Sequence, residues 1–286
     1  IRFGTFQYFA ARGDDEALQH LTDYVIARHY PDCQDTERPA LALLEEVMQR
    51  TAALIAAWQG LGFIHGVMNT DNMLICGETI DYGPCAMMDG FRINQVFSSI
   101  DHAGRYAYHQ QPAIGQWNLL ALADALLPII DPDREEAIRL AKGVLEGYGP
   151  TFKRFYAERC AAKLGLEASD ESDTLFQSLL EVMQQHHLDF TDTFIELESI
   201  RFNGLKAPES LSAWLPSWFE ALDGKNDTDA LAAMRNANPA LIARNHQIEF
   251  AIQEACHNGD FARFDLLRAA VTDPFSRTHI GTPLSE

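Results

Sequence analysis

The sequence has few cysteines, and none of them is paired in a way that would bind a metal or build a disulfide framework. Five cysteines are scattered over 286 residues, and no two form a C-x-x-C motif. A zinc ribbon needs such pairs and a disulfide-rich scaffold needs a dense, even set, so both classes are excluded. The sparse thiols favour a reducing, cytosol-like compartment.

Positive charge is also scarce. The chain has 22 Lys and Arg residues against 41 Asp and Glu residues, which gives a formal charge of −19. Proteins that follow nucleic-acid backbones do so through clustered Lys and Arg, so we expect no nucleic-acid partner. With 47% hydrophobic and 10% aromatic residues, the chain can bury a sizeable core and does not have the composition of a disordered protein.

A long uninterrupted apolar run is missing as well. The longest, over residues 119–130, is broken by Asp124 and is shorter than the ~20 residues that a membrane-spanning helix needs. We therefore expect no membrane span and no membrane partner.

The residues that are present predict a mainly α-helical fold. Acidic residues at 14–16 begin a helix that runs to about His29, and Pro39 begins a long amphipathic helix that ends at Gly60 and Gly62. Residues 114–130 are apolar on nearly every side, which is typical of a buried helix. We expect further helices over 133–147, 150–165, 171–187, 190–200, 209–222, 228–236, 246–258 and 260–271.

One small β-hairpin interrupts this helical pattern. Residues 73–76 and 79–82 have strand character and are joined by Gly77 and Glu78, which suits a two-residue turn. Residues 84–112 are rich in turn-forming residues and form a long irregular segment, a feature that is usually functional or disordered.

The segment around this hairpin has the spacing of a protein-kinase catalytic loop. Kinases have the pattern H-R-D-x-x-x-x-N followed by D-F-G; here Asn72 follows His65 by seven residues, and Asp81-Tyr82-Gly83 stands in place of D-F-G. Asn72 and Asp81 offer the hard oxygen atoms that Mg²⁺ prefers, with phosphate and water completing its coordination. They are therefore the candidate metal ligands.

The position of the kinase catalytic base departs from this pattern. Two residues after His65 stands Val67, which cannot accept a proton. Either Asp71 serves as the base from a different point on the loop, or the chain is a pseudokinase. A third interpretation is that Asp71 and Asn72 only form a polar turn, but their register with His65 and Asp81 disfavours it.

The same segment resembles the selenoprotein O (SelO/YdiU) family of kinase-like protein adenylyltransferases. HGVMNTDNM followed by TIDYGP carries the resemblance most specifically, over residues 63–84, and IRFGTFQYF, GRYAY, QWNL and the Asn238–His246 region extend it to about residue 275. The resemblance implies ATP bound in an orientation flipped relative to kinases, and transfer of AMP to Ser, Thr or Tyr hydroxyls of proteins. It also implies a cytoplasmic location in bacteria, or a mitochondrial one in a eukaryote.

The resemblance assigns roles to four residues. Asp71 corresponds to the proton acceptor, Asn72 and Asp81 correspond to ligands of Mg²⁺ or Mn²⁺, and Arg2 matches a nucleotide-contacting arginine. A flipped nucleotide also accounts for Val67, because a base placed for transfer of the γ-phosphate has no task when the α-phosphate is attacked. The expected partners are ATP and hydroxyl-bearing proteins.

The sequence lacks the family's N-terminal lobe, with its glycine-bearing loop and phosphate-contacting Lys, so we expect a fragment equivalent to the kinase-like C-terminal lobe. We expect this lobe over 1–271, with a catalytic core at about 1–130, a helical extension over 131–271 and an irregular tail over 272–286. Two alternatives remain open: a kinase-like phosphotransferase, and a non-catalytic nucleotide-binding pseudokinase module.

Overall fold

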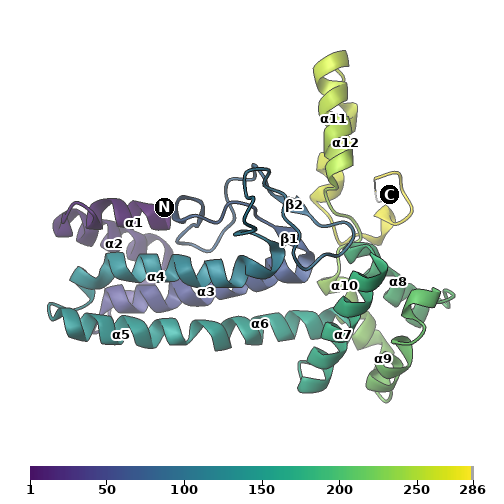
Figure 1. Ribbon diagram of the computed structural model, residues 1–286, viewed down its shortest axis with the longest axis horizontal. Coiled ribbons are helices and arrows are strands. Elements are labelled where there is room, and N and C mark those ends of the chain that lie inside the picture. The colour runs from purple at the N-terminus through teal and green to yellow at the C-terminus, as the bar shows by residue number, and fades with distance from the viewer. Residues whose placement is uncertain (285–286) are drawn as a thin grey trace. The chain divides into compact units, whose positions relative to one another are not determined.

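The computed structural model describes residues 1–284 and is mainly helical (Figure 1). Its only named strands among these residues, β1 (Phe63–Ile64) and β2 (Ala86–Met87), form a two-stranded antiparallel sheet in which Phe63 pairs with Met87 and Ile64 with Ala86. The prediction of a mainly α fold with one small β element is confirmed. The predicted tail over 272–286 contains a 3-10 turn at Arg277–His279, and its last two residues lie outside the described range.

The chain divides into two compact units that interleave along the sequence. Unit 1 comprises Ile1–Ala57, His65–Cys85 and Ser98–Phe155, and unit 2 comprises Trp58–Ile64, Ala86–Phe97 and the residues from Tyr156 onward. The predicted division into a core over 1–130 and an extension over 131–271 concerns function and stays a prediction.

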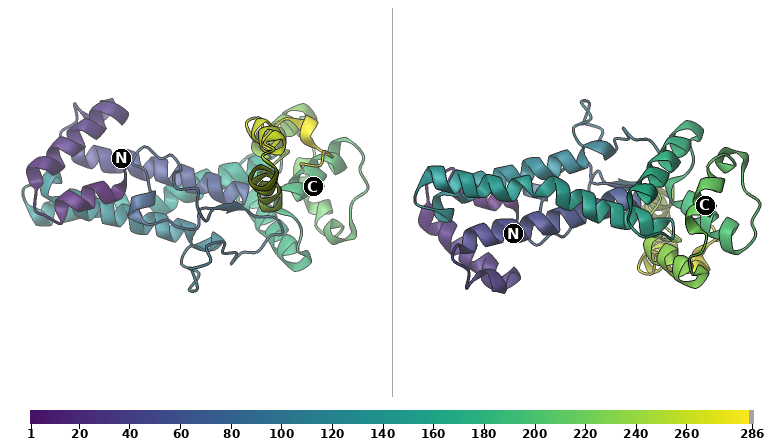
Figure 2. Two further views of the ribbon diagram at one scale, coloured as in Figure 1. Left: turned by 90° about the horizontal axis from the view of Figure 1, so that it is seen from above. Right: turned by 90° about the horizontal axis from the view of Figure 1, so that it is seen from below.

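Unit 1 is a helical bundle that contains the predicted site loop. Its helices are α1 (Phe3–Ala10), α2 (Asp15–His29), most of α3 (Pro39–Leu61), α4 (Gln111–Ile130), α5 (Arg134–Glu146) and the first half of α6 (Tyr148–Lys163). Helix α4 packs against α1 and α5 (Figure 2), and it is buried along most of its length. It therefore forms the centre of the bundle.

The ends of these helices follow from local chemistry. The Asp14 side chain accepts a hydrogen bond from the Ala17 amide at 3.0 Å and caps α2, whose first turn carries Asp15 and Glu16. Pro39 is the first residue of α3, where its missing amide hydrogen costs nothing. Both helices begin within a residue of the predicted positions.

Helix α4, with the turn before it, is the only helix in residues 1–284 that is long and apolar enough to cross a membrane. The segment is Tyr108–Ile130, and 56% of its most apolar window is buried inside the protein. Core helices of soluble proteins pass the same test, so the absence of a membrane span stays a prediction.

Unit 2 consists of the small sheet and shorter helices. They are the end of α6, α7 (Asp170–His186), α8 (Phe190–Phe202), α9 (Leu215–Leu222), α10 (Asp227–Ala237), α11 (Asn245–Gln253), a π-helical turn (Glu254–Asn258) and α12 (Ala262–Val271). Its core includes Phe176 stacked on Phe194 and the adjacent pair Trp214 and Trp218. A capping box at Ser169 and a cap from Asp189 begin α7 and α8.

The predicted hairpin is wrong in detail. Residues 73–76 and 79–82 make a single bridge, Met73 to Thr79, and no named strands. Residues 73–75 pair instead with the N-terminal residues 1–3, and Leu74 forms a β-bridge with Arg2. The Phe3 amide donates to the Met73 carbonyl at 3.0 Å, and the Ile75 amide donates to the Ile1 carbonyl at 2.9 Å.

The helices differ from the prediction at three places. Helix α1 was not predicted, and the helices expected over 209–222 and 246–258 are each divided into two elements. The first contains a 3-10 turn at Glu209–Leu211 before α9, which begins next to Pro216, and the second changes from α11 to the π-helical turn.

Candidate functional site

His65 organises the loop that holds the predicted site residues. The Val67 amide donates to its Nδ1 at 3.3 Å, so the proton lies on Nε2, which donates to the Ile80 carbonyl at 2.8 Å. Burial lowers the pKa of His65, which favours this neutral form. His65 therefore has a structural role, because its ring joins the backbone of Val67 to that of Ile80, the residue before Asp81.

The Asn72 side chain is bonded to the segment of residues 65–67. Its Nδ2 atom donates to the Val67 carbonyl at 3.0 Å, so both backbone polar groups of Val67 are used to hold the loop. This bond orients the amide of Asn72, and its Oδ1 atom makes no hydrogen bond with any residue in 1–284. Asn72 therefore presents an uncommitted oxygen ligand.

Asp81 has an unusual backbone conformation. Its φ angle is 57°, and His187 is the only other non-glycine residue with a positive φ among the described residues. Such a conformation is costly for a residue with a Cβ atom and is found preferentially at functional sites. The Asp81 carboxylate is exposed and forms no hydrogen bond or ion pair within residues 1–284, so it is also free to bind a ligand.

Asp71 belongs to the 3-10 turn Thr70–Asn72 and lies beside the first turn of helix α1. The Asn69 side chain caps this turn by accepting from the Asp71 amide at 3.0 Å, and Arg2 Nη1 donates to the Asp71 carbonyl at 3.5 Å. The Asp71 carboxylate is exposed and lies against Gly4, where a Cβ atom would overlap with it. The structure thus brings Arg2 and Asp71 together, although 69 positions separate them.

Two residues of α4 support the loop and were not predicted to do so. Gln111 Oε1 accepts from the His65 amide at 3.0 Å, and Asn118 Nδ2 donates to the Met68 carbonyl at 2.8 Å and to the Ile114 carbonyl at 2.9 Å. Both side chains are fully buried. Asn118 is a polar residue inside an otherwise apolar helix, and that pattern is the one feature of the sequence that could have indicated its supporting role.

Gly66 is required by close packing rather than by chemistry. Its φ angle is +81°, and a Cβ atom there would lie 2.8 Å from the Pro84 carbonyl oxygen. The segment after His65 can therefore approach the segment after Asp81 only with glycine at this position.

The donor set fits a hard divalent cation but does not make a complete site by itself. No group of three or more His, Cys, Asp or Glu side chains in residues 1–284 is arranged to hold a metal. Asn72 Oδ1 and the Asp81 carboxylate are uncommitted oxygens of the kind that Mg²⁺ and Mn²⁺ accept, and such ions normally complete their coordination with water and phosphate oxygens.

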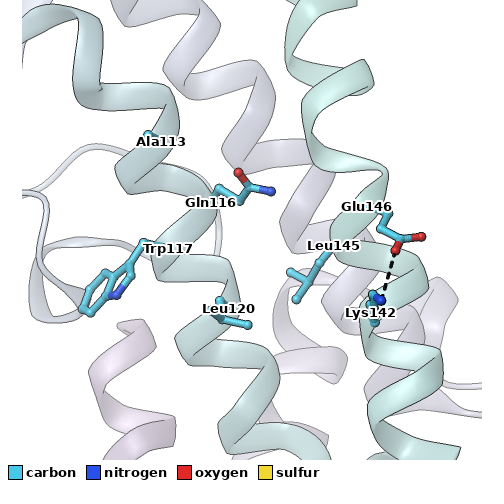
Figure 3. A pocket seen from close by; sticks show the side chains of 7 residues that line it. All are labelled: Ala113, Gln116, Trp117, Leu120, Lys142, Leu145 and Glu146. Carbon is cyan, nitrogen blue, oxygen red and sulfur yellow. Dashed lines mark ion pairs between the residues drawn. The ribbon is translucent and has the colours of Figure 1, made fainter.

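A separate hollow lies between α4 and α5 (Figure 3). It measures about 400 Å³ and includes exposed Trp117 and Leu120, with Lys142 and Glu146 paired at 3.8 Å on its α5 side. None of the predicted site residues lines it, so it is distinct from the loop site.

Comparison with known proteins places the chain in a family. The family model described as "Protein adenylyltransferase SelO" matches residues 1–272. A protein of Rhizobium rhizogenes described as "Protein nucleotidyltransferase YdiU" is 48% identical over 298 residues, which covers 100% of this chain and 59% of that protein. Proteins with the same description from Agrobacterium fabrum and Bradyrhizobium sp. are each 49% identical over 286 residues, covering 96% of this chain and 58% of theirs.

The chain therefore spans less than two thirds of the length of these relatives. The match runs through every element that builds the loop site, from Arg2 on the N-terminal strand-like segment to Asn118 on α4. On the family match and these identities together, the chain belongs to the SelO family of nucleotidyltransferases.

Proposed function

We propose that the whole protein is an ATP- and metal-dependent protein adenylyltransferase with a kinase-like fold, and that this chain supplies its C-terminal lobe. The family description and the nucleotidyltransferase descriptions of the relatives support this proposal. The relatives are considerably longer, which supports the proposal that a further, N-terminal lobe belongs to the same polypeptide.

One observation carries the proposal more than any other. Asn72 is bonded directly to the Val67 carbonyl, and Asp81 follows the residue that accepts from His65, so both are tied to residues 65–67. The side-chain oxygens that would contact substrate or metal are left without other partners within residues 1–284. A loop that holds the Asn72 side chain and the backbone before Asp81 in place, and leaves the ligand atoms of both residues uncommitted, is preorganised for binding.

In this proposal Asp71 is the proton acceptor. A Ser, Thr or Tyr hydroxyl of the protein substrate gives its proton to the Asp71 carboxylate as its oxygen forms a bond to the α-phosphorus of ATP. The bond between that phosphorus and the bridging oxygen breaks, and the electron pair leaves with pyrophosphate. The protein substrate gains AMP, and the Asp71 proton is then released to solvent.

The other candidate residues hold the nucleotide. Asn72 and Asp81 would hold Mg²⁺ or Mn²⁺, which supplies neutralisation of the negative charge on the phosphates. Arg2 offers an exposed guanidinium next to the Asp71 backbone, where a phosphate or ribose oxygen can accept from it. Val67 has no acid–base role, since its contribution is its backbone amide and carbonyl.

Intact-protein mass spectrometry tests the proposal. The whole protein, including its N-terminal lobe, is incubated with ATP and Mg²⁺ or Mn²⁺ in the presence of an added protein, beside Asp71→Asn. An AMP-sized adduct that the wild type forms and the variant does not is the expected result. The matched control is Asp35→Asn, which removes the same charge from an exposed residue that forms no hydrogen bond or ion pair within 1–284, and it should keep the adduct.

Other outcomes would replace the proposal with one of its alternatives. A phosphate-sized adduct would make the protein a kinase-like phosphotransferase. ATP binding that needs no metal, without any adduct and unchanged in Asp71→Asn, would make it a non-catalytic pseudokinase module. The 286-residue chain alone should bind ATP weakly and turn over little, and full activity of this chain would contradict the proposed need for a second lobe.

A further inference from the structure

Helices α11 and α12 present an unusual concentration of exposed apolar side chains. Of the eighteen large apolar residues that are exposed within residues 1–284, six fall between positions 248 and 266. These six, which we call the α11–α12 surface, are Ile248, Phe250, Ile252, Phe261, Phe264 and Leu266. Four of the six, Ile248, Ile252, Phe261 and Phe264, line one groove, and monomeric soluble domains rarely leave such a continuous apolar area in water unless something binds it.

A groove between the two helices adds to this surface. It measures about 490 Å³ and its walls are almost entirely carbon, with Arg268 as the one charged residue among those that line it. Ile248, Ile252, Phe261 and Phe264 of the α11–α12 surface border the groove, and Cys256 lies in its wall. An apolar groove of this kind resembles one half of a permanent interface more than a polar, transient one.

The helical pair is secured at its base but not covered along its length. Arg244, just before α11, is buried and pairs with Asp89 at 2.6 Å, Asp189 at 2.7 Å and Asp192 at 3.1 Å. Beneath α12 lies a small cluster of Leu241, Leu267, Ala270 and Leu284. These contacts hold the pair in place and leave the α11–α12 surface open.

The helix geometry is also irregular at this surface. Helix α11 ends in a π-helical turn, Glu254–Asn258, which contains Cys256 and closes with Gly259 at a φ of 64°. Isolated π-helical turns are rare and occur preferentially at functional positions. The irregular turn therefore coincides with the wall of the groove.

We propose that the α11–α12 surface is a docking face for the N-terminal lobe of the whole protein, and that this lobe inserts apolar side chains into the groove. The inference rests on the proposed function, in which this chain is the C-terminal lobe of a longer polypeptide. The lengths of the relatives support the presence of such a lobe, because the chain covers only 59% and 58% of two of them. A tethered lobe is present at an effective concentration of about millimolar, so it covers such a face in preference to a separate protein.

Cys256 gives a direct readout of this cover, because it is exposed in this chain and lines the groove. Its rate of alkylation by a maleimide can be followed by peptide mass spectrometry in the 286-residue chain and in the whole protein. We expect labelling in the whole protein to be at least about tenfold slower. The double variant Ile252→Asp/Phe264→Asp in the whole protein should restore the rate of the chain.

The matched control is Ile138→Asp, which places the same charge at an exposed apolar position of α5 and should leave Cys256 protected. Circular dichroism establishes that each variant is folded. Equal Cys256 labelling in the chain and in the whole protein would overturn the proposal. The proposal would also be overturned if Cys256 in the 286-residue chain were labelled more slowly at higher protein concentration while light scattering showed a dimer. A second copy of the chain would then cover the α11–α12 surface. The readout needs no nucleotide, so a failure of adenylylation would leave it unaffected.

Discussion

The Asp71 carboxylate lies against the backbone of Gly4, in the first turn of α1, so closely that a Cβ atom on Gly4 would overlap with Oδ1. Gly4 therefore defines the space in which the proposed proton acceptor sits. The neighbouring backbone of α1 is held in turn by the bonds between residues 1–3 and residues 73–75.

Gly4→Ala should displace the Asp71 carboxylate while preserving the helix, since Ala is a better helix former than Gly. We expect AMP transfer by the whole protein to fall about 10- to 100-fold, because a displacement of about 1 Å is enough for such losses. The melting temperature should change little. Gly143→Ala is the matched control, as it lies within α5 with no atom near its absent Cβ, and it should keep full activity.

His65→Phe should destabilise the protein by roughly 2–4 kcal/mol, because the Val67 amide and the Ile80 carbonyl both lose their partner. The effect has a pH signature. The pKa of His65 is lowered in the folded protein, so its contribution is present above pH 6.5 and is lost as the pH falls through the folded value. Urea unfolding at pH 7.5 and pH 5 should show a smaller difference between wild type and variant at the lower pH. An equal difference at both would contradict the neutral, buried imidazole.

Lys163 is fully buried, and within residues 1–284 it forms no ion pair. Its ammonium lies 3.8 Å from the centre of the Phe194 ring, and burial lowers its pKa to about 7. Between that value and 10.5 the unfolded chain binds more protons, so the free energy of unfolding rises with pH. Lys163→Met should remove roughly 2–4 kcal/mol of that rise between pH 7 and pH 10. Denaturation curves of both proteins measured in parallel isolate this group, and parallel pH profiles would contradict the lowered pKa.

Arg244 is the buried centre of three ion pairs, to Asp89, Asp189 and Asp192. Arg244→Met should cost about 3 kcal/mol of stability, because three neighbouring carboxylates lose their common partner. Asp192→Asn in the same molecule should recover part of the loss by removing one of the repelling charges. Arg139→Met breaks only an exposed pair with Glu136, which water and salt screen, so its loss of stability should be much smaller. Equal losses in the two single variants would show that the Arg244 cluster has no special role.

The sequence predicted those helices whose ends are determined by nearby residues. Asp14, Pro39 and Ser169 act within one turn of their own helices, and the starts of α2, α3 and α7 match the prediction within a residue or two. The hairpin was wrong because its strand partners are far away: residues 73–75 pair with residues 1–3. Helix α1 was missed for a related reason, since its eight residues show little pattern of their own.

For the candidate site, spacing along the sequence located the loop but not its supports. The interval from His65 to Asn72 is local, and the two residues do share the Val67 backbone. Gly4, Gln111 and Asn118 reach the loop from α1 and α4, so their contribution depends on tertiary packing. The positive φ of Asp81 had no signal in the sequence, because aspartate is compatible with ordinary backbone conformations as well.

The interleaving of the two units has a consequence for synthesis on the ribosome. All of unit 1 is available once Phe155 has emerged, whereas unit 2 must wait for the residues from Tyr156 onward. Until then the strands β1 and β2 and the buried side chains of Met88 and Phe91 belong to a unit whose remaining helices have not been made. No single cleavage separates the units, so neither can be produced as one continuous piece, and the early segments of unit 2 are the part of the nascent chain that depends most on protection from aggregation.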